Sequence, residues 1–250
     1  MKIQNLCLGG GKPSPMARWL SCAIAILLLA GCSTVPFETE PKANFQGLEP
    51  AAVVENFDAA VGQRFELLQS VVFSFFGKGF TGMGYLSVDP QSGTYALSCM
   101  TPAGITLFSI EGMGDEVKAQ FSVPGFDKHG DQIARSLARD LRRIYLGWSP
   151  PADASLKQKK TRLVFKSKQE GETIKHTYSG TRRLLTEKRF SKGWKTRCVV
   201  RYYDYETING KLYPKGIILH NKQFHYRMTL RLKEVYEQAN EGNDSEQGIK

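Results

Sequence analysis

The sequence has little of what marks several common classes of protein. Its 24 glycines and 11 prolines are irregularly spaced among 250 residues, which excludes a fibrous or collagen-like chain. No period of about 20 to 50 residues recurs, so a repeat array is excluded as well. The uncharged apolar run near the N-terminus, Trp19–Leu29, has only 11 residues and is too short to span a bilayer. With 41% hydrophobic residues, the chain still has enough apolar side chains to fold around one core.

Motifs for catalysis or for metal binding are also missing. The segment 77–82 matches the pattern GxGxxG, but it lies between two strand-like runs, whereas a phosphate-binding loop must open a helix. His220 and His225 lack the i,i+4 spacing of a zinc protease, and no GxSxG segment supplies a nucleophile. The sequence therefore predicts a protein that is not an enzyme, with no cofactor and no metal site.

The N-terminus carries a targeting segment. The run Trp19–Leu29 follows a basic residue and leads through Ala30 and Gly31 to Cys32, which is typical of a secretory signal and resembles a bacterial lipobox. This pattern predicts that Cys32 becomes the N-terminus and carries diacylglycerol and palmitate, which together make anchoring effectively permanent. Ser33, in place of an aspartate, is typical of lipoproteins sent to the outer membrane. The expected location is therefore the outer membrane, with the protein facing the periplasm.

Charge is strongly segregated along the mature chain. Loss of residues 1–31 lowers the net charge from +10 to +7. Residues 157–233 hold 21 Lys and Arg against 5 Asp and Glu, whereas residues 33–156 hold 9 against 14. The C-terminal block predicts an anionic partner, such as anionic headgroups or a phosphate-bearing molecule. Nucleic acid is not expected outside the cytoplasm.

The domain organisation follows from these shifts in composition. We expect a signal peptide at residues 1–31, a lipidated tether at 32–50, a single domain at 51–237 and a polar tail at 238–250. Translation could start at Met1 or at Met16, where the signal would have a more ordinary beginning. Cys99 and Cys198 are the cysteines that remain without lipid, and either a disulfide or two free thiols fits a compartment that permits disulfides.

Most of the predicted domain consists of strands. Residues 64–75 alternate apolar side chains on one face, with Gln69 as the exception, and a turn at 89–93 joins two strand-like segments. Many strands at short spacing predict an antiparallel barrel or a sandwich. The predicted strands are residues 64–75, 82–88, 94–100, 105–110, 116–123, 161–166, 173–178, 182–190, 195–205, 212–220 and 224–235.

Helices are predicted at two places. From residue 131 to 146, apolar side chains recur at helical spacing within about 80° of a helical wheel, with arginines elsewhere on it. This helix either packs on the sheet or acts as a lid over a barrel mouth. A weaker helix is predicted at residues 50–61, and a loop with a basic run at 157–160.

Alternation along the later strands also predicts which residues face inward. Lys and Arg are expected on the outer face of the C-terminal strands. Their inner face is expected to be apolar and to contain Val164, Leu184, Val199, Leu219 and Leu230.

The order of these segments resembles the outer-membrane lipoprotein receptor family of the lipoprotein localisation pathway, LolB, and related LolB-like, DUF3261-type lipoproteins. The resemblance covers roughly residues 64–235. The segments that carry it are 100–107, around Pro102-Ala103-Gly104, together with 139–150, 203–205, 213–217 and 227–235.

The resemblance implies a half-open antiparallel β-barrel with a helical lid, whose apolar interior holds acyl chains. A membrane-facing loop, Pro102-Ala103-Gly104, matches the receptor's loop tip, where Ala103 is too small to be an effective apolar wedge. The residues expected to line the hydrophobic cavity are Phe73, Phe75, Leu86, Leu97, Leu107 and Ile110, and those expected on the lid are Ile133, Leu137, Leu141 and Ile144.

Two functions follow as hypotheses. The first is an outer-membrane lipoprotein that binds acyl chains in lipoprotein localisation or in the transfer of another lipid-linked product. Its partners would be lipoprotein or other acyl-chain cargo and a periplasmic carrier protein, and the protein is expected to be a monomer. The second is a non-enzymatic assembly or scaffold lipoprotein that docks through a basic face.

Overall fold

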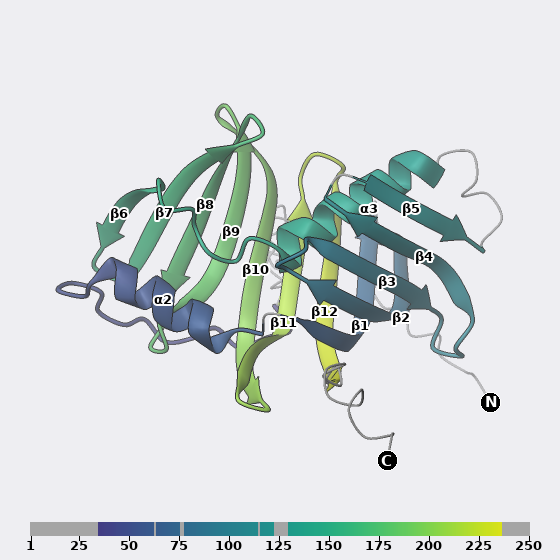
Figure 1. Ribbon diagram of the computed structural model, residues 1–250, viewed down its shortest axis with the longest axis horizontal. Coiled ribbons are helices and arrows are strands. Elements are labelled where there is room, and N and C mark those ends of the chain that lie inside the picture. The colour runs from purple at the N-terminus through teal and green to yellow at the C-terminus, as the bar shows by residue number, and fades with distance from the viewer. Residues whose placement is uncertain (1–34, 63, 76–77, 115, 123–129, 237–250) are drawn as a thin grey trace, which may run out of the picture. The chain divides into compact units, whose positions relative to one another are not determined.

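The computed structural model describes residues 35–62, 64–75, 78–114, 116–122 and 130–236 (Figure 1). A compact unit begins at Phe37. Part of the expected tether belongs to this unit, since Phe45 is fully buried and its backbone N–H donates to the Lys160 carbonyl at 2.8 Å. Among the described residues, no helix is long and apolar enough to cross a membrane.

The described residues form one antiparallel sheet of twelve strands. Its spatial order is β5-β4-β3-β2-β1-β12-β11-β10-β9-β8-β7-β6. Strands that are adjacent in the sheet are consecutive in the sequence, with the single exception of the pair β1 and β12. The strands are β1 (Phe65–Phe75), β2 (Lys78–Asp89), β3 (Thr94–Met100), β4 (Thr106–Met113), β5 (Glu116–Phe121), β6 (Ser155–Lys159), β7 (Arg162–Gln169), β8 (Glu172–Ser179), β9 (Leu184–Lys192), β10 (Lys195–Ile208), β11 (Lys211–Asn221) and β12 (Tyr226–Tyr236).

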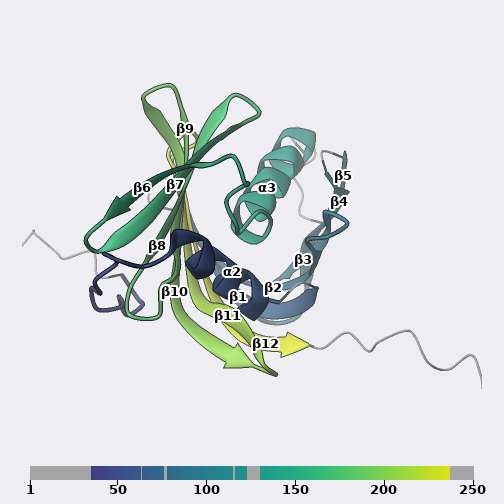
Figure 2. The ribbon, with the colours of Figure 1, turned by 60° about the vertical axis from the view of Figure 1, so that its left-hand side comes forward.

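The sheet is open, because its two edge strands, β5 and β6, lie at opposite ends of the order. Helix α3 (Gly130–Tyr145) connects these edges and lies in the hollow of the curved sheet (Figure 2). Helix α2 (Pro50–Ala60) begins with a proline, which is favourable in a first helical turn, and buries Phe57 against Tyr178 of β8. The expected half-open barrel with a helical lid is confirmed.

Short-range signals explain the hairpins. In the turn between β2 and β3, the Asp89 carboxylate accepts the backbone N–H groups of Gln91 and Ser92, and Gly93 adopts a φ of +71°. This turn sets the register in which Leu86 faces Leu97. Apolar side chains on alternate positions of neighbouring strands therefore line up on one face of the sheet.

The core lies between the concave face of the sheet and the two helices. Leu67, Leu86, Leu97, Ile110 and Ala119 are successive partners across β1 to β5 and form one apolar row on this face. Their side chains belong to, or pack against, a single buried cluster that extends across the sheet to β8 and β9. This apolar row positions α3.

One strand was missed by the sequence patterns. Residues 155–159 were expected to be a loop, but they form the edge strand β6. All five residues of β6 are exposed, so neither face had to be apolar and no alternation marked the strand.

Candidate functional site

The residues expected to line an acyl cavity fall into two groups. Leu86, Leu97 and Ile110 lie side by side in the apolar row, with exposures of 0%, 9% and 0%. Phe73 is half-buried at the far part of β1, and Phe75, two positions on, is 41% exposed. The structure therefore brings three of these residues together in the core and leaves the two phenylalanines near its border.

Leu107 occupies a different position from the others. The pairing of β3 with β4 shifts between Cys99, opposite Phe108, and Met100, opposite Thr106, so Leu107 is the extra residue of a bulge. It is half-buried. Phe108 is the β4 residue that shares the face of Cys99.

The expected lid residues all lie on α3. Leu141 and Ile144, in its second half, are buried, whereas Ile133 and Leu137 in the first half are half-buried. The start of the helix lies beside β5, since a Cβ on Gly130 would stand 3.4 Å from the Phe121 ring. The helix is therefore packed most tightly at its C-terminal end.

Polar contacts hold the second half of α3 to the sheet. The Tyr145 hydroxyl donates to Gln69 Oε1 at 2.6 Å, which explains why β1 carries a buried glutamine on its apolar face. The Tyr202 hydroxyl donates to the Ile144 carbonyl at 2.7 Å. Among the described residues, the side-chain hydrogen bonds and ion pairs of α3 come from this second half of the helix.

A buried carboxylate adds to this attachment. Asp140 is 1% exposed and accepts hydrogen bonds from the Tyr226 hydroxyl and from Asn221 Nδ2, the latter at 3.3 Å. Burial raises the pKa of Asp140, although these hydrogen bonds and the nearby Arg143 charge oppose the shift. Asp140 thus fastens α3 to β11 and β12.

On the side of Tyr145 and Trp148, the end of α3 packs closely against the sheet. A cavity of about 10 Å³ lies near Tyr145 and Trp148, lined also by residues of β1, β11 and β12. That volume is less than an acyl chain needs. An apolar strip continues beyond it toward the N-terminal end of α3. Its residues are half-buried Val71, Phe73, Phe108 and Phe121, together with the exposed Phe75.

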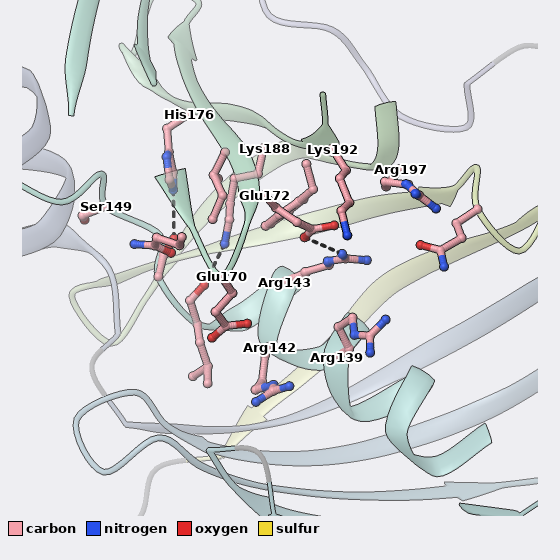
Figure 3. Close-up of a pocket in the computed structure, with 16 residues that line it drawn as sticks. Arg139, Arg142, Arg143, Ser149, Glu170, Glu172, His176, Lys188, Lys192 and Arg197 are labelled. Carbon is pink, nitrogen blue, oxygen red and sulfur yellow. Dashed lines mark hydrogen bonds and ion pairs between the residues drawn. The ribbon is translucent and has the colours of Figure 1, made fainter. Parts of the chain in front are cut away.

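A much larger hollow lies at the other side of α3. Its volume is about 570 Å³, within the range of pockets that hold small ligands. It lies between the C-terminal end of α3 and the concave ends of β7 to β10 (Figure 3). We call it the basic pocket; its lining residues are Arg139, Arg142, Arg143, Leu146, Gly147, Ser149, Gln169, Glu170, Glu172, Ile174, His176, Lys188, Phe190, Lys192, Arg197 and Gln223.

Lys188 is the most deeply buried cation of this pocket, at 2% exposure. Its Nζ donates to the Leu146 carbonyl at 2.7 Å, just after the end of α3. Burial, together with the Arg143 charge, lowers the pKa of Lys188 to about 7. A lysine in this state is sensitive to any negative charge that enters the pocket.

His176 lies next to Lys188 on the neighbouring strand and is 3% exposed. Its Nε2 is 3.1 Å from the Gly147 carbonyl, which only accepts, so the proton of the neutral ring belongs on Nε2. Nδ1 is buried and has no hydrogen-bond partner among the described residues. Burial and the Lys188 charge lower the pKa of His176 to about 4, which keeps the ring neutral at pH 7.

The inward-facing residues of the C-terminal strands differ from those expected. Leu219 and Leu230 face the core as predicted, but Lys188 and His176 share the row of Leu219. Val164 and Val199 alternate with inward-facing neighbours and lie on the outer face, so the inward prediction was wrong for them. Leu184 is buried beside a bulge.

The basic pocket was missed because nothing local in the sequence marks it. Lys188 lies within a run of basic strands whose charges were assigned to the outer face. A one-residue shift at the bulge between Thr177 and Tyr178 sets which residues of β9 face inward. That shift has no signal in the sequence.

Other predicted positions are placed as follows. Pro102, Ala103 and Gly104 form an exposed turn between β3 and β4, followed by Ile105, which is 66% exposed. Cys32 lies outside the described residues.

The open cysteine question has a structural answer. Cys99 and Cys198 are both buried and free, so two thiols, not a disulfide, are present. Burial raises the pKa of Cys99 to about 11 and that of Cys198 to about 12, which makes both unreactive. No group of three or more histidine, cysteine or acidic residues in the described ranges could hold a metal ion.

Comparison with solved structures places this architecture in a class. The fold is similar to that of a LolA superfamily protein from Nitrosomonas europaea, with a TM-score of 0.50 and 8% identity over 77% of this chain and 95% of that chain. A putative outer membrane lipoprotein-sorting protein domain from Vibrio parahaemolyticus follows, with a TM-score of 0.49 and 10% identity over 76% and 92% of the two chains. The protein thus has a LolA-like fold.

Sequence comparison gives the family. Residues 66–234 match the family described as "Protein of unknown function (DUF3261)", and the chain belongs to that family. No curated protein sequence matches the chain.

Proposed function

We propose that the protein is an outer-membrane lipoprotein, anchored through Cys32 and facing the periplasm, that binds acyl chains of a lipid-linked molecule. The binding would serve lipoprotein localisation or the transfer of another lipid-linked product. The LolA-like fold and the lipobox-like segment ending at Cys32 support this proposal.

The observation that carries the proposal is the apolar strip. Phe73 and Phe108 pack against the core from half-buried positions, and Phe75 is 41% exposed. The strip therefore continues the dry interior of the sheet to the surface. An acyl chain placed along it would gain about 0.8 kcal/mol for each methylene that leaves water.

Helix α3 supplies the lid. Its second half is fixed by the contacts of Asp140, Tyr145 and the Ile144 carbonyl. Its first half carries the half-buried Ile133 and Leu137, and Gly130 at its start lies beside Phe121 of the strip. A helix held at one end moves most easily at the other. The cavity beside the fixed end, near Tyr145 and Trp148, measures only about 10 Å³, so we expect an acyl chain to enter by outward movement of the first half.

The loop at Pro102-Ala103-Gly104 is an exposed turn between β3 and β4, which is compatible with the membrane-facing role. Ala103 contributes little apolar area, but Ile105 beside it is 66% exposed. Ile105 would supply the contact with the bilayer that Ala103 cannot.

Lipid binding can be measured on the full chain carrying Cys32→Ser, which removes the expected attachment site for the protein's own lipid. We expect co-purified lipid in native mass spectrometry and uptake of a fluorescent fatty acid. Phe73→Ser and Leu137→Ser should each weaken uptake by about tenfold, because both place a polar group against the chain. The absence of both bound lipid and uptake would rule out the proposal.

A matched control lies on the same strand. Val72 is 41% exposed, neighbours Phe73 in sequence and lies on the opposite face of β1. Val72→Ser should leave fatty-acid uptake within about twofold of the parent chain. Equal losses in the Val72 and Phe73 variants would show that the strip is not the binding surface.

The basic outer face favours a second function, docking on an anionic envelope partner as a scaffold. Lys166, Lys175 and Arg189 are register partners on β7, β8 and β9 and form one row on the convex face. Charge reversal at Lys166 and Lys175 should release such a partner in a pull-down and leave fatty-acid uptake unchanged. This outcome, with no fatty-acid binding by the parent chain, would select the scaffold function.

A further inference from the structure

The basic pocket holds far more positive than negative charge. Six of its lining residues are lysines or arginines and two are glutamates. Glu172 is already engaged, since its Oε2 accepts from Arg143 Nη2 at 2.8 Å. The pocket therefore has a net formal charge of +4 when all these groups are ionised, although it lies in a partly enclosed hollow.

Several of these cations lack an anionic partner. Arg139 on α3, Lys192 on β9 and Arg197 on β10 make no ion pair within the described ranges of the chain. Arg197 Nε is buried and has no hydrogen-bond acceptor there. Figure 3 shows the ends of Lys192 and Arg143 directed toward the same space beside Glu172. Arg139 and Lys192 are exposed to solvent, but the buried Arg197 Nε is a donor that an anion in the pocket could satisfy.

Contacts within the fold hold two cations of the pocket in place. The Arg143 guanidinium lies 4.9 Å from the centroid of the Phe190 ring, and Lys188 Nζ lies 5.8 Å from it. The hydrogen bond of Lys188 to the Leu146 carbonyl fixes the ammonium group further. These groups are therefore already in place before a ligand arrives, which lowers the entropic cost of binding.

From this arrangement we propose that the basic pocket binds a phosphate group carried by a ligand. A phosphate brings up to two negative charges and several acceptor oxygens, which suits a cluster of guanidinium and ammonium donors better than the single charge of a carboxylate. A volume of about 570 Å³ exceeds that of one phosphate and leaves room for the group that carries it. The site is separate from the apolar strip, so the inference goes beyond acyl-chain binding and does not depend on it.

The state of Lys188 supports this assignment. Its lowered pKa, about 7, results from burial and from repulsion by Arg143. An anion bound between Lys188 and Arg143 would counter both effects, because it restores a partner for the charge. The exposed basic residues at 157–160 and at 182–183 lie outside the pocket.

Titration calorimetry tests the proposal on the full chain carrying Cys32→Ser, with inorganic pyrophosphate as the probe and acetate as the carboxylate comparison. We expect pyrophosphate to bind at least tenfold more tightly than acetate. The double variant Lys192→Gln/Arg197→Gln should weaken pyrophosphate binding by on the order of 100-fold, about tenfold for each charged contact removed. Arg139→Gln, an exposed helix position, provides an independent single variant with an expected loss of about tenfold.

The matched control removes the same number of charges elsewhere. Lys157 and Lys159 are exposed on β6 and do not line the pocket. Lys157→Gln/Lys159→Gln should change affinity by less than about twofold, and thermal melting should show that every variant remains folded. Equal losses in the two double variants, equal affinity for acetate, or no binding of pyrophosphate would each overturn the proposal.

Two further arms identify the source of the phosphate. Dihexanoyl phosphatidic acid carries a phosphomonoester on short acyl chains, whereas dihexanoyl phosphatidylcholine covers its phosphate with choline. Tighter binding of the phosphatidic acid than of pyrophosphate, with weak binding of the phosphatidylcholine, would identify a lipid headgroup. Equal binding of the phosphatidic acid and pyrophosphate would identify a soluble phosphate. Because fatty-acid uptake is measured separately, loss of acyl binding and loss of phosphate binding remain distinguishable.

Discussion

The two halves of the sheet present different surfaces to the same helix. On β2 to β4 the residues facing α3 include Leu86, Leu97 and Ile110, which are almost fully buried in a dry interface. On β8 and β9 the concave face carries His176 and Lys188 beside a pocket of about 570 Å³. The pleat thus determines which residues face inward, but it does not make the inner face uniformly apolar.

The largest expected effect is on stability, and it distinguishes the two halves of the sheet. We call the half with β2 to β4 the packed half and the half with β8 and β9, beside the basic pocket, the hollow half. Ile110→Ala removes a fully buried side chain and should cost about 2 to 5 kcal/mol of unfolding free energy, because the cavity it leaves cannot collapse completely. Ile174→Ala, at a residue that lines the basic pocket, should fall at the lower end of this range, because its surroundings are already partly open. Urea denaturation of both variants measures the difference, and equal costs would contradict it.

The next effect belongs to the hollow half and depends on pH. The pKa of His176 is lowered from 6.5 to about 4 in the folded protein, so the unfolded state binds the proton more readily. Stability is complete above pH 6.5 and is lost as the pH falls toward 4, by about 2 to 3 kcal/mol from this group. His176→Gln should lose less stability than the parent over this range in urea titrations at pH 7 and pH 4. The same acid loss in both proteins would refute the assignment.

A smaller effect on stability is expected from the hydrogen bond that attaches α3 to β1. Tyr145→Phe leaves the buried oxygen of Gln69 without its donor and should cost about 1 to 3 kcal/mol. Tyr236→Phe is the control, because that hydroxyl donates to Glu234 at an exposed position, and it should cost less than about 0.5 kcal/mol. Hydrogen exchange of the first half of α3 should also rise in the Tyr145 variant. An unchanged denaturation midpoint would show that this bond does not hold the helix.

The smallest effect on stability is expected in the loop between β3 and β4, in the packed half of the sheet. Ile105→Ser should change unfolding free energy by less than about 0.5 kcal/mol, because the side chain is 66% exposed. Its binding to vesicles should nevertheless fall several-fold, since an isoleucine at a bilayer surface gains free energy by leaving water. Sedimentation with anionic vesicles measures this, with Trp194→Ser, an 89% exposed site on the basic half, as the comparison. A larger loss in the Trp194 variant would place the membrane contact on the other half.

Much of the fold could be predicted because its signals are local. Alternation at 64–75 and helical spacing at 131–146 gave β1 and α3 to within one residue at either end. Gln69 interrupted the first pattern, and its reason lies 76 residues away in the Tyr145 hydroxyl. Such a partner is set by tertiary packing, so no reading of the strand alone could explain it.

The candidate site was predicted less well. Leu86 and Leu97, expected to line a cavity, lie side by side in the packed core, because a tight turn fixes the register in which they face each other. The basic pocket was missed because Lys188 faces inward only through the register of β9 against β8, next to a bulge. Whether a lysine in a basic strand faces solvent or the core depends on that pairing.

The sequence by itself determined most of the elements and their order, though not β6, because hydrophobic periodicity and turn residues act over a few neighbouring positions. It also determined the concentration of positive charge at residues 157–233. Only the tertiary structure decided where that charge lies. The curved sheet and α3 enclose Lys188 and Arg143 in one hollow, because strand register and helix attachment together place residues 45 positions apart beside the same Phe190 ring.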